Sequence, residues 1–335
     1  RCPYHGWEFN REGHCTDQPN EPETSSFKSK VTMKSYPVEN LGGLLWAYLG
    51  PLPAPLIPRL DGLVAEGTVR TLGYAEIPCN WLQIMENSLD IVHTEWCHGA
   101  LTNYLREAEG VKTAIAKHHL KYGWSETDYG IVKRRVLEGH TEEDDDWTIG
   151  HPIYFPCALA SSNEGDLWRE FRFRFRVPID DTHTMHYWYA GYVPPRGKSA
   201  PQKLLDRMCV YPVKYLDDNG EYLLHEIHTQ DIMVWITQGA IAQRHLERLG
   251  TPDKGITMYR RMLLRELNRM EEGHDPMNVL RDSAKNEIVR LPCEREKAQR
   301  VDGFEVYMRR NHSKYLPIIE DVIDVMRPVL PTAAE

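Results

Sequence analysis

The feature that most constrains this chain is a run of potential metal ligands, Asp90, His93 and His98, in the pattern Asp-x2-His-x4-His. In a regular helix a step of three residues falls about 60° short of a full turn, so Asp90 and His93 are neighbours. A step of five overshoots a turn by about 140°, so His93 and His98 cannot both point at one ion. We therefore expect the helix over 81–93 to end or bulge before His98, with Gly99 as a stop. The alternative is a surface helix with two unrelated histidines.

Composition excludes several classes of protein. The chain has 335 residues, a formal net charge of -9 and a pI near 5.9, which argues against a nucleic-acid partner. No run approaches the roughly 18 apolar residues of a membrane span, so we expect no membrane association. The seven cysteines are odd in number and scattered, which argues against a disulfide framework and predicts a cytoplasmic protein.

Prolines divide the chain. Four prolines fall between residues 51 and 58, where they can neither continue a sheet nor enter a helix. We therefore predict a linker over 51–60, a first domain of short strands over 1–50 and a second domain over 61–335. In the second domain we expect strands within about 112–195, including 171–177 and 186–193, and then helices. The helical pattern covers 201–216, 228–250 and a charged amphipathic stretch over 255–273.

One predicted strand alternates strictly. Over 171–177 the pattern places three Phe on one face and three Arg on the other. Candidate walls of a substrate pocket are Phe171, Phe173, Phe175 and Trp188, although residues of this kind in a strand more often belong to a plain core. Arg174 or a neighbouring Arg is suited to bind a substrate carboxylate. The alternative is an Arg face that points to solvent or an interface.

The first residues carry half of a second ligand set. Cys2-Pro3-Tyr4-His5-Gly6-Trp7 holds a Cys-x-x-His pair, and a Rieske [2Fe–2S] centre uses two Cys on one iron and two His on the other. We expect the partner Cys-x-His pair upstream, and hence a chain that begins inside the motif. With Asp-x2-His-x4-His, these residues make the chain resemble the Rieske non-haem iron aromatic oxygenases. It is most similar to the phthalate dioxygenase-like group, which includes aryl O-demethylases.

This resemblance implies an α+β fold, in which a partial Rieske β-domain precedes a helix-grip (START-like) catalytic domain with an antiparallel sheet and C-terminal helices. It implies that His93, His98 and a downstream carboxylate, Asp231, hold a mononuclear non-haem Fe(II) with open positions for O2 and substrate. His225, Glu226 and His228 compete with Asp231 for that role. Asp90 would bridge His93 to His5 of a neighbouring subunit.

The resemblance also implies partners and a reaction. NAD(P)H would supply electrons through a ferredoxin or flavin reductase, and a homotrimer or stacked hexamer would join the two metal centres. The substrate would be an aromatic acid, and the C-terminal region favours O-demethylation of a methoxylated lignin-derived compound such as dehydrodivanillate. Ring cis-dihydroxylation of a phthalate-like acid is the alternative within the enzyme class.

Three other classes remain as rivals. A Rieske-type electron carrier would end near residue 60. A non-catalytic hydrophobe-binding helix-grip protein would keep the pocket without the ligands. A structural zinc protein needs a closed set of four ligands, whereas two His and one carboxylate leave positions open.

Overall fold

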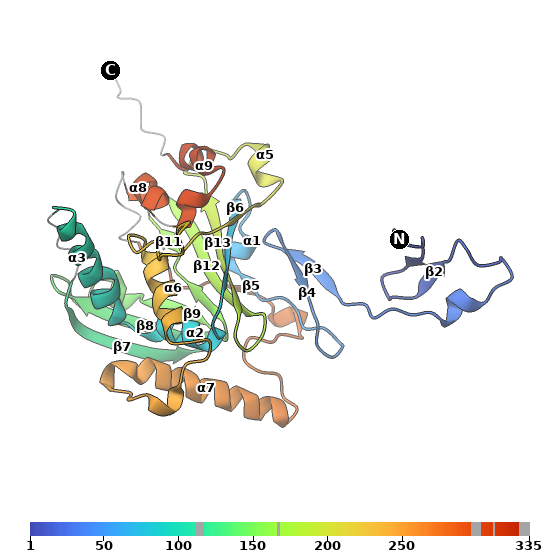
Figure 1. The fold of residues 1–335 in the computed structure, drawn as a ribbon, viewed down its shortest axis with the longest axis horizontal. Helices are drawn as coiled ribbons and strands as arrows, with labels where there is room; N and C mark the ends of the chain where they lie inside the picture. The colour runs from blue at the N-terminus through green and yellow to red at the C-terminus, as the bar shows by residue number, and fades with distance from the viewer. Residues whose placement is uncertain (112–116, 166–167, 296–302, 311, 328–335) are drawn as a thin grey trace, which may run out of the picture.

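The chain is seen in a computed structural model that describes residues 1–111, 117–165, 168–295, 303–310 and 312–327. A large, mostly antiparallel sheet forms its centre (Figure 1). The strand order is β14-β6-β13-β12-β10-β9-β8-β7, with β11 beside β12 and only β14 running parallel to its neighbour. The strands are β6 (Val69–Ile77), β7 (His119–Thr127), β8 (Gly130–Leu137), β9 (His151–Tyr154), β10 (Ala158–Ala160), β11 (Asn163–Glu164), β12 (Arg169–Pro178), β13 (Thr184–Val193) and β14 (Cys209–Pro212).

Helices cover one face of this sheet (Figure 1). Apolar residues of α2 and α7 pack against β8, β9 and β10, where Ile131, Ile153 and Leu159 are buried. Residues of α6, α8 and α9 pack against β6 and β13 around the buried Trp188. The helices on this face are α2 (Trp81–Leu89), α6 (Ile227–Thr237), α7 (Lys254–Glu271), α8 (Gly303–Arg310) and α9 (Ile319–Met326).

The opposite face of the sheet holds a second core. Phe173 and Tyr189 pack there against Leu60 and Leu63, and Trp46 reaches the ring of Phe175 at a centroid distance of 6.0 Å. The N-terminal hairpin, which consists of β3 and β4, therefore lies on this face. The elements here are β3 (Val38–Leu41), β4 (Leu44–Ala47), β5 (Arg59–Leu60), α1 (Asp61–Val64) and β15 (Ile288–Val289), which pairs in parallel with β5.

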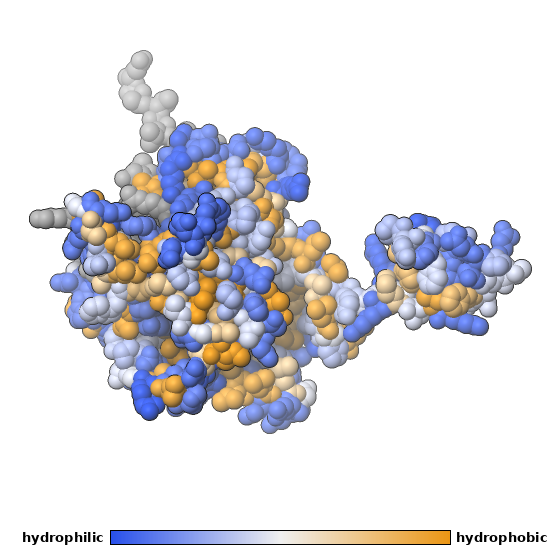
Figure 2. Space-filling view, viewed as in Figure 1, coloured by the Kyte–Doolittle hydropathy of each residue, from blue (hydrophilic) through white to orange (hydrophobic). Residues whose placement is uncertain are grey.

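The first residues stand apart from this body (Figures 1 and 2). They form a small hairpin of β1 (Glu8–Phe9) and β2 (Cys15–Asp17), followed by a 3-10 turn, η1 (Phe27–Lys30). The ring of Trp7 meets Phe27 edge-on at 5.9 Å. The division of the chain at 51–60 stays a prediction.

The α+β class and the predicted strands over 171–177 and 186–193 are confirmed, whereas two predicted helices are wrong in extent. Residues 201–216 form only a short helix, α5 (Gln202–Leu205), because the next residues pair with the edge of β6 as β14. The helix predicted over 228–250 ends at Thr237, since Gly239 takes a φ of +90° that stops the helix. The stretch over 255–273 is α7.

The molecular surface is mixed in polarity. Figure 2 shows apolar side chains along the lower edge, over α7, where Leu264, Leu267 and Met270 are each more than half exposed. Among the helices of the described ranges, none combines the length and the apolar character that a membrane crossing requires.

Candidate iron centre

The helix that carries the first ligands breaks as its spacing requires. Asn80 starts α2 by accepting a hydrogen bond from the amide of Leu82 at 3.0 Å, and the helix stops at Leu89. Asp90 is extended, with φ −68° and ψ 127°. The chain then re-enters a π-helical segment, η2 (Thr94–Ala100), and continues into α3 (Leu101–Ala108). The expected break is confirmed, but the expected stop at Gly99 is wrong because the helix runs through it.

The π-helical segment solves the problem posed by a step of five residues. Its hydrogen bonds join residues five apart, so residues at that spacing lie on one side of the helix. The rings of His93 and His98 accordingly meet, with centroids 5.1 Å apart.

Asp231 joins these two histidines from α6. Its Oδ1 lies 3.5 Å from Nε2 of His93 and 3.2 Å from Nε2 of His98. All three side chains are less than one fifth exposed. The structure thus brings together the three residues that sequence reasoning assigned to one ion, although Asp231 lies far from both histidines in the chain.

The donor set fits a divalent iron. One ligand atom from each of His93, His98 and Asp231 lies within 4.8 Å of the others. Oδ1 of Asp231 is buried and accepts no hydrogen bond from the residues that the structure describes. A buried carboxylate oxygen without a donor is costly unless a cation neutralises it. Two imidazoles and one carboxylate are the facial set of non-haem Fe(II) oxygenases.

Gln230 orients one of the ligands, and sequence reasoning missed it. Its Oε1 lies 2.9 Å from Nδ1 of His98, and its amide nitrogen donates to Thr102 Oγ1 at 3.0 Å and to the carbonyl of Leu224 at 2.7 Å. Because the amide is fixed by these two acceptors, Nδ1 of His98 must be the donor, and its Nε2, which faces Asp231, is the atom that a metal would bind in place of a proton. The only signal in the sequence is that Gln230 precedes Asp231.

The neighbouring histidines keep the carboxyl group of Asp231 ionised. Although burial raises the pKa of Asp231, the neighbouring His98 and His93 lower it further, to well below its usual range. Burial lowers the pKa of His98, but the Asp231 carboxylate outweighs this and raises it to about 10. The carboxylate is therefore available as an anionic ligand.

Asp90 lies beside this centre but outside the ligand set. Its Oδ2 is 3.6 Å from Nδ1 of His93, and its Oδ1 accepts a hydrogen bond from the amide of Val92 at 2.9 Å. One quarter of its side chain is exposed, so the carboxylate reaches the surface while it faces His93.

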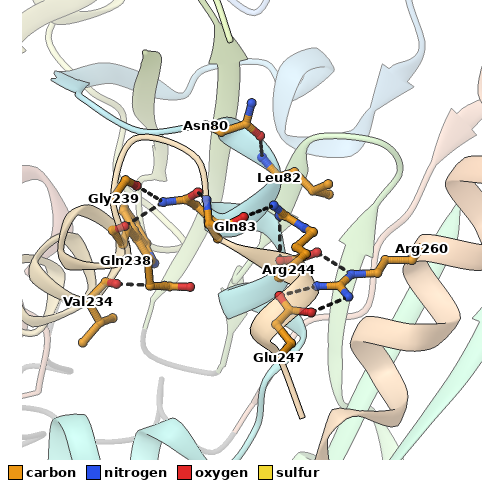
Figure 3. A network of polar contacts seen from close by, with 12 residues as sticks. Asn80, Leu82, Gln83, Val234, Gln238, Gly239, Arg244, Glu247 and Arg260 are labelled. Carbon is orange, nitrogen blue, oxygen red and sulfur yellow. Dashed lines mark hydrogen bonds and ion pairs between the residues drawn. The ribbon is translucent and has the colours of Figure 1, made fainter. Parts of the chain in front are cut away.

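A polar network locks α2 to α6 and α7 (Figure 3). The amide of Gln83 donates to the carbonyls of Trp235 and Gly239 at 2.8 and 2.9 Å, at the end of α6. Glu86 pairs with Arg244 at 3.0 Å and with Arg260 of α7 at 2.7 Å. These contacts fix the helix that precedes His93 against the helix that carries Asp231.

The arginine face of β12 points toward this centre. Arg176 donates to Ser88 of α2 at 2.8 Å, and Arg172 contacts Tyr307 of α8. Burial lowers the pKa of Arg174, and the guanidinium of Arg172 lowers it further, whereas the Asp231 carboxylate raises it. Among the described residues, the guanidinium of Arg174 has no hydrogen bond and no ion pair.

The remaining predicted pocket residues divide between the two faces. Trp188 lies opposite Arg174 in the register of β12 and β13, and so shares its face. The structure places Phe171, Phe173 and Phe175 on the other face, against the N-terminal hairpin and α1. The alternation in the sequence correctly separates the two faces of β12. It does not indicate which of these faces the helices cover.

The competitors for the third ligand are engaged elsewhere. His225 pairs with Glu109 at 3.6 Å. Glu226 lies 3.1 Å from His228 and also pairs with Lys314. The structure brings only Asp231 of this group to the two histidines.

Cys2 and His5 lie on one tight loop at the surface. The amide of Gly6 donates to the carbonyl of Cys2 at 2.9 Å, and that of Cys2 donates to the carbonyl of Trp7 at 2.7 Å. Gly6 has a φ of +76°, which a residue with a side chain rarely adopts. The exposed Cys2 and His5 flank this turn, a geometry suited to coordinating a cluster from one side.

Comparisons with known proteins match two parts of this chain and several relatives along most of it. A family described as Rieske [2Fe-2S] domain matches residues 1–37, and one described as LigXa C-terminal domain like matches residues 214–290. The 5,5'-dehydrodivanillate O-demethylase oxygenase subunit of Sphingobium sp. strain SYK-6 is 38% identical over 87% of this chain and 66% of its own length. The phthalate 4,5-dioxygenase oxygenase subunit of Pseudomonas putida is 27% identical over 83% of this chain and 69% of its own length. The solved structure of Pseudomonas putida CBB5 NdmA is similar in fold, with a TM-score of 0.52 at 16% identity, over 82% of this chain and 72% of that one.

The fold and the site define a Rieske-type, non-haem iron class of protein. The chain belongs to the Rieske oxygenases, a family of oxidoreductases, as an oxygenase (alpha) subunit of the phthalate dioxygenase-like and aryl O-demethylase group. It spans about two thirds of the length of these two curated relatives. The family assigns it an iron–sulfur cluster and iron as cofactors.

Proposed function

We propose that this chain is the catalytic part of an oxygenase that removes a methyl group from a methoxylated aromatic acid. The observation that carries the proposal is the convergence of His93, His98 and Asp231 in a protein 38% identical to an aryl O-demethylase subunit. In the balanced reaction, an aryl methyl ether, O2, two electrons and two protons give a phenol, formaldehyde and water.

The residues of this chain would bind the iron, orient its ligands and shield the site from water. His93, His98 and Asp231 would hold an iron(II) that supplies the activation of O2 when bound. Gln230 keeps Nε2 of His98 directed at that position. The helices over the sheet exclude water, which strengthens each electrostatic contact within the site.

Arg174 would bind the carboxylate of the substrate. An unpaired guanidinium under a helix layer is costly, and an anion that enters the site relieves this cost. Its planar fork matches a carboxylate through two parallel hydrogen bonds. Trp188, on the same face, would form a wall for the aromatic ring. Phe171, Phe173 and Phe175 have no part in this pocket.

Asp90 would carry electrons between subunits. In one chain the loop of Cys2 and His5 stands well away from α2 (Figure 1). We propose a head-to-tail homotrimer, or a stacked hexamer, in which His5 of one subunit faces Asp90 of the next. An NAD(P)H-dependent ferredoxin or flavin reductase would supply the electrons. The cytoplasm, predicted from the scattered cysteines, is the proposed location.

Formaldehyde release tests the reaction. The protein with both metal centres would be given a reductase, NADH, and either methoxybenzoates or phthalate. We expect formaldehyde in equal amount to the demethylated phenol, and no product from a His98→Ala variant. A cis-dihydrodiol from phthalate, without formaldehyde from any methoxybenzoate, would instead establish ring dihydroxylation, the alternative favoured by the 27% identity to phthalate 4,5-dioxygenase.

A non-catalytic hydrophobe carrier is the rival from another class. Such a protein has no use for two imidazoles around an ionised, buried carboxylate. Binding of aromatic acids without any turnover in the iron-loaded protein would favour it.

A further inference from the structure

Two side chains from the sheet donate hydrogen bonds to the end of α2, next to Asp90. The indole Nε1 of Trp124 donates to the carbonyl of Leu89 at 2.9 Å. The ammonium of Lys133 donates to the carbonyl of Asp90 at 3.3 Å. Two consecutive carbonyls thus receive one donor each, at the point where the backbone leaves the helix.

These two donors act as a unit. Trp124 on β7 and Lys133 on β8 are direct cross-strand partners, so their side chains leave the same face of the sheet side by side. The last carbonyls of a helix have no partner within the helix and must be satisfied from outside. Here the partners are fixed to a sheet, which sets where the helix ends.

A third residue makes room for the indole. Gly255 near the start of α7 is buried, and a Cβ placed on it would lie 2.2 Å from Nε1 of Trp124. Nothing in its backbone conformation requires glycine, since its φ lies outside the left-handed region. Contact with the donor atom of Trp124 is therefore the reason that the structure offers for glycine here.

We propose that Trp124 and Lys133, with Gly255 behind them, are positioning residues that aim Asp90 for electron transfer to the iron centre. This inference rests on the proposed bridging role of Asp90. Among the described residues neither side chain forms a hydrogen bond with an iron ligand or with Arg174, although the ammonium of Lys133 interacts electrostatically with Asp231 and Arg174. It acts through the backbone, because φ and ψ at residue 90 decide whether its carboxylate faces His93 or follows the helix.

The test separates electron transfer from metal binding. In the protein with both centres loaded, the reduced cluster would be mixed with O2 and substrate, and the rate of cluster oxidation followed by its visible spectrum. Trp124→Phe keeps the ring packing and removes only the N–H, and Lys133→Gln removes the ammonium. We expect each to slow cluster oxidation by about tenfold while iron content and the spectrum of the cluster stay unchanged. Gly255→Ala should resemble Trp124→Phe.

Two matched controls accompany these variants. Trp46→Phe removes a similar indole donor, which bonds the carbonyl of Leu41 at 3.0 Å on the opposite face of the sheet. Gly250→Ala adds a Cβ whose nearest neighbour would lie at an ordinary 3.6 Å. Both should transfer electrons at the unmodified rate.

The variant Asp90→Asn separates failure of the positioning role from failure of the proposed bridge. If Asp90→Asn is slow but Trp124→Phe and Lys133→Gln match the unmodified protein, the positioning role is overturned and the bridge stands. If Asp90→Asn itself transfers electrons at the full rate, the bridge is overturned and the inference with it. Loss of iron in Trp124→Phe and Lys133→Gln would show that the pair holds the ligands rather than Asp90, which also overturns the inference.

Discussion

Replacing Glu86 by glutamine should weaken the link between α2, the helix that precedes His93, and α7. Glu86 is buried, at 7% exposure, and its two oxygens pair separately with Arg244 and Arg260 at 3.0 and 2.7 Å. In Glu86→Gln, Arg260 keeps Glu247 at 2.8 Å, whereas Arg244 keeps only a weak contact to a backbone carbonyl at 3.4 Å. One guanidinium is thus left without a carboxylate in the part of the chain that the structure describes.

The size of the effect follows from these contacts. A hydrogen bond to a charged group contributes about 1.5–3 kcal/mol, and breaking a buried ion pair costs about 3–5 kcal/mol. Both arginines are about one quarter exposed, which places the expected loss near the lower limit, about 3 kcal/mol. At roughly 2–4 °C per kcal/mol for a large domain, the thermal midpoint should fall by about 6–12 °C.

Thermal unfolding followed by circular dichroism measures this loss. The matched control is Glu142→Gln, which removes an ion pair with Lys121 at 2.7 Å in which both side chains are about half exposed. Such a pair contributes at most about 1 kcal/mol, so the midpoint should move little. A shift in Glu86→Gln no larger than in Glu142→Gln would refute the argument that this network joins α2 to α7.

Three further predictions concern the site and its surroundings. Gln230→Leu should lower the affinity for Fe(II) by about 10–100-fold in equilibrium dialysis, and unchanged affinity would contradict its role in orienting His98. Arg174→Gln should raise KM for a methoxybenzoate by roughly 10–100-fold but leave the methyl ester unaffected, and an equal effect on both would exclude carboxylate binding. Burial lowers the pKa of His186 and His312 well below the ordinary 6.5, so only the unfolded chain takes up their protons as the pH falls below that value. Urea unfolding should therefore show no contribution from them above about pH 6.5 and a loss of stability below it that approaches about 2.7 kcal/mol per pH unit, whereas a flat profile down to pH 5 would refute their neutrality.

The candidate ligands could be predicted from the sequence, because the spacing of the first three is local and the combination of residue types is rare. Asp90, His93 and His98 fall within nine residues, so helix geometry alone predicts that the helix must break between them. The pattern left open whether the helix ends or bulges, and it does not reveal the donors from distant strands, Trp124 and Lys133, that bind the backbone at the break. Asp231 came from resemblance, since nothing local distinguishes it from a solvated helix residue.

The pocket shows where periodicity stops being informative. Alternation on β12 correctly separates phenylalanine from arginine, and apolar residues normally face the larger core. Both faces of this sheet are covered, however, so the phenylalanines fill the layer beneath the N-terminal hairpin and the arginines lie under the helices. Charged residues on a covered face are found where a site needs them. β14 was missed for a related reason, because pairing with the edge of β6 overrides its helical pattern.

The central claim is that His93, His98 and Asp231 hold one iron. The most direct measurement is the amount of iron and acid-labile sulfide per chain in the anaerobically purified protein and in its His98→Ala and Asp231→Ala variants. The account predicts that each variant loses one iron per chain while sulfide and the spectrum of the cluster stay constant. Iron content that stays unchanged in both variants would contradict it.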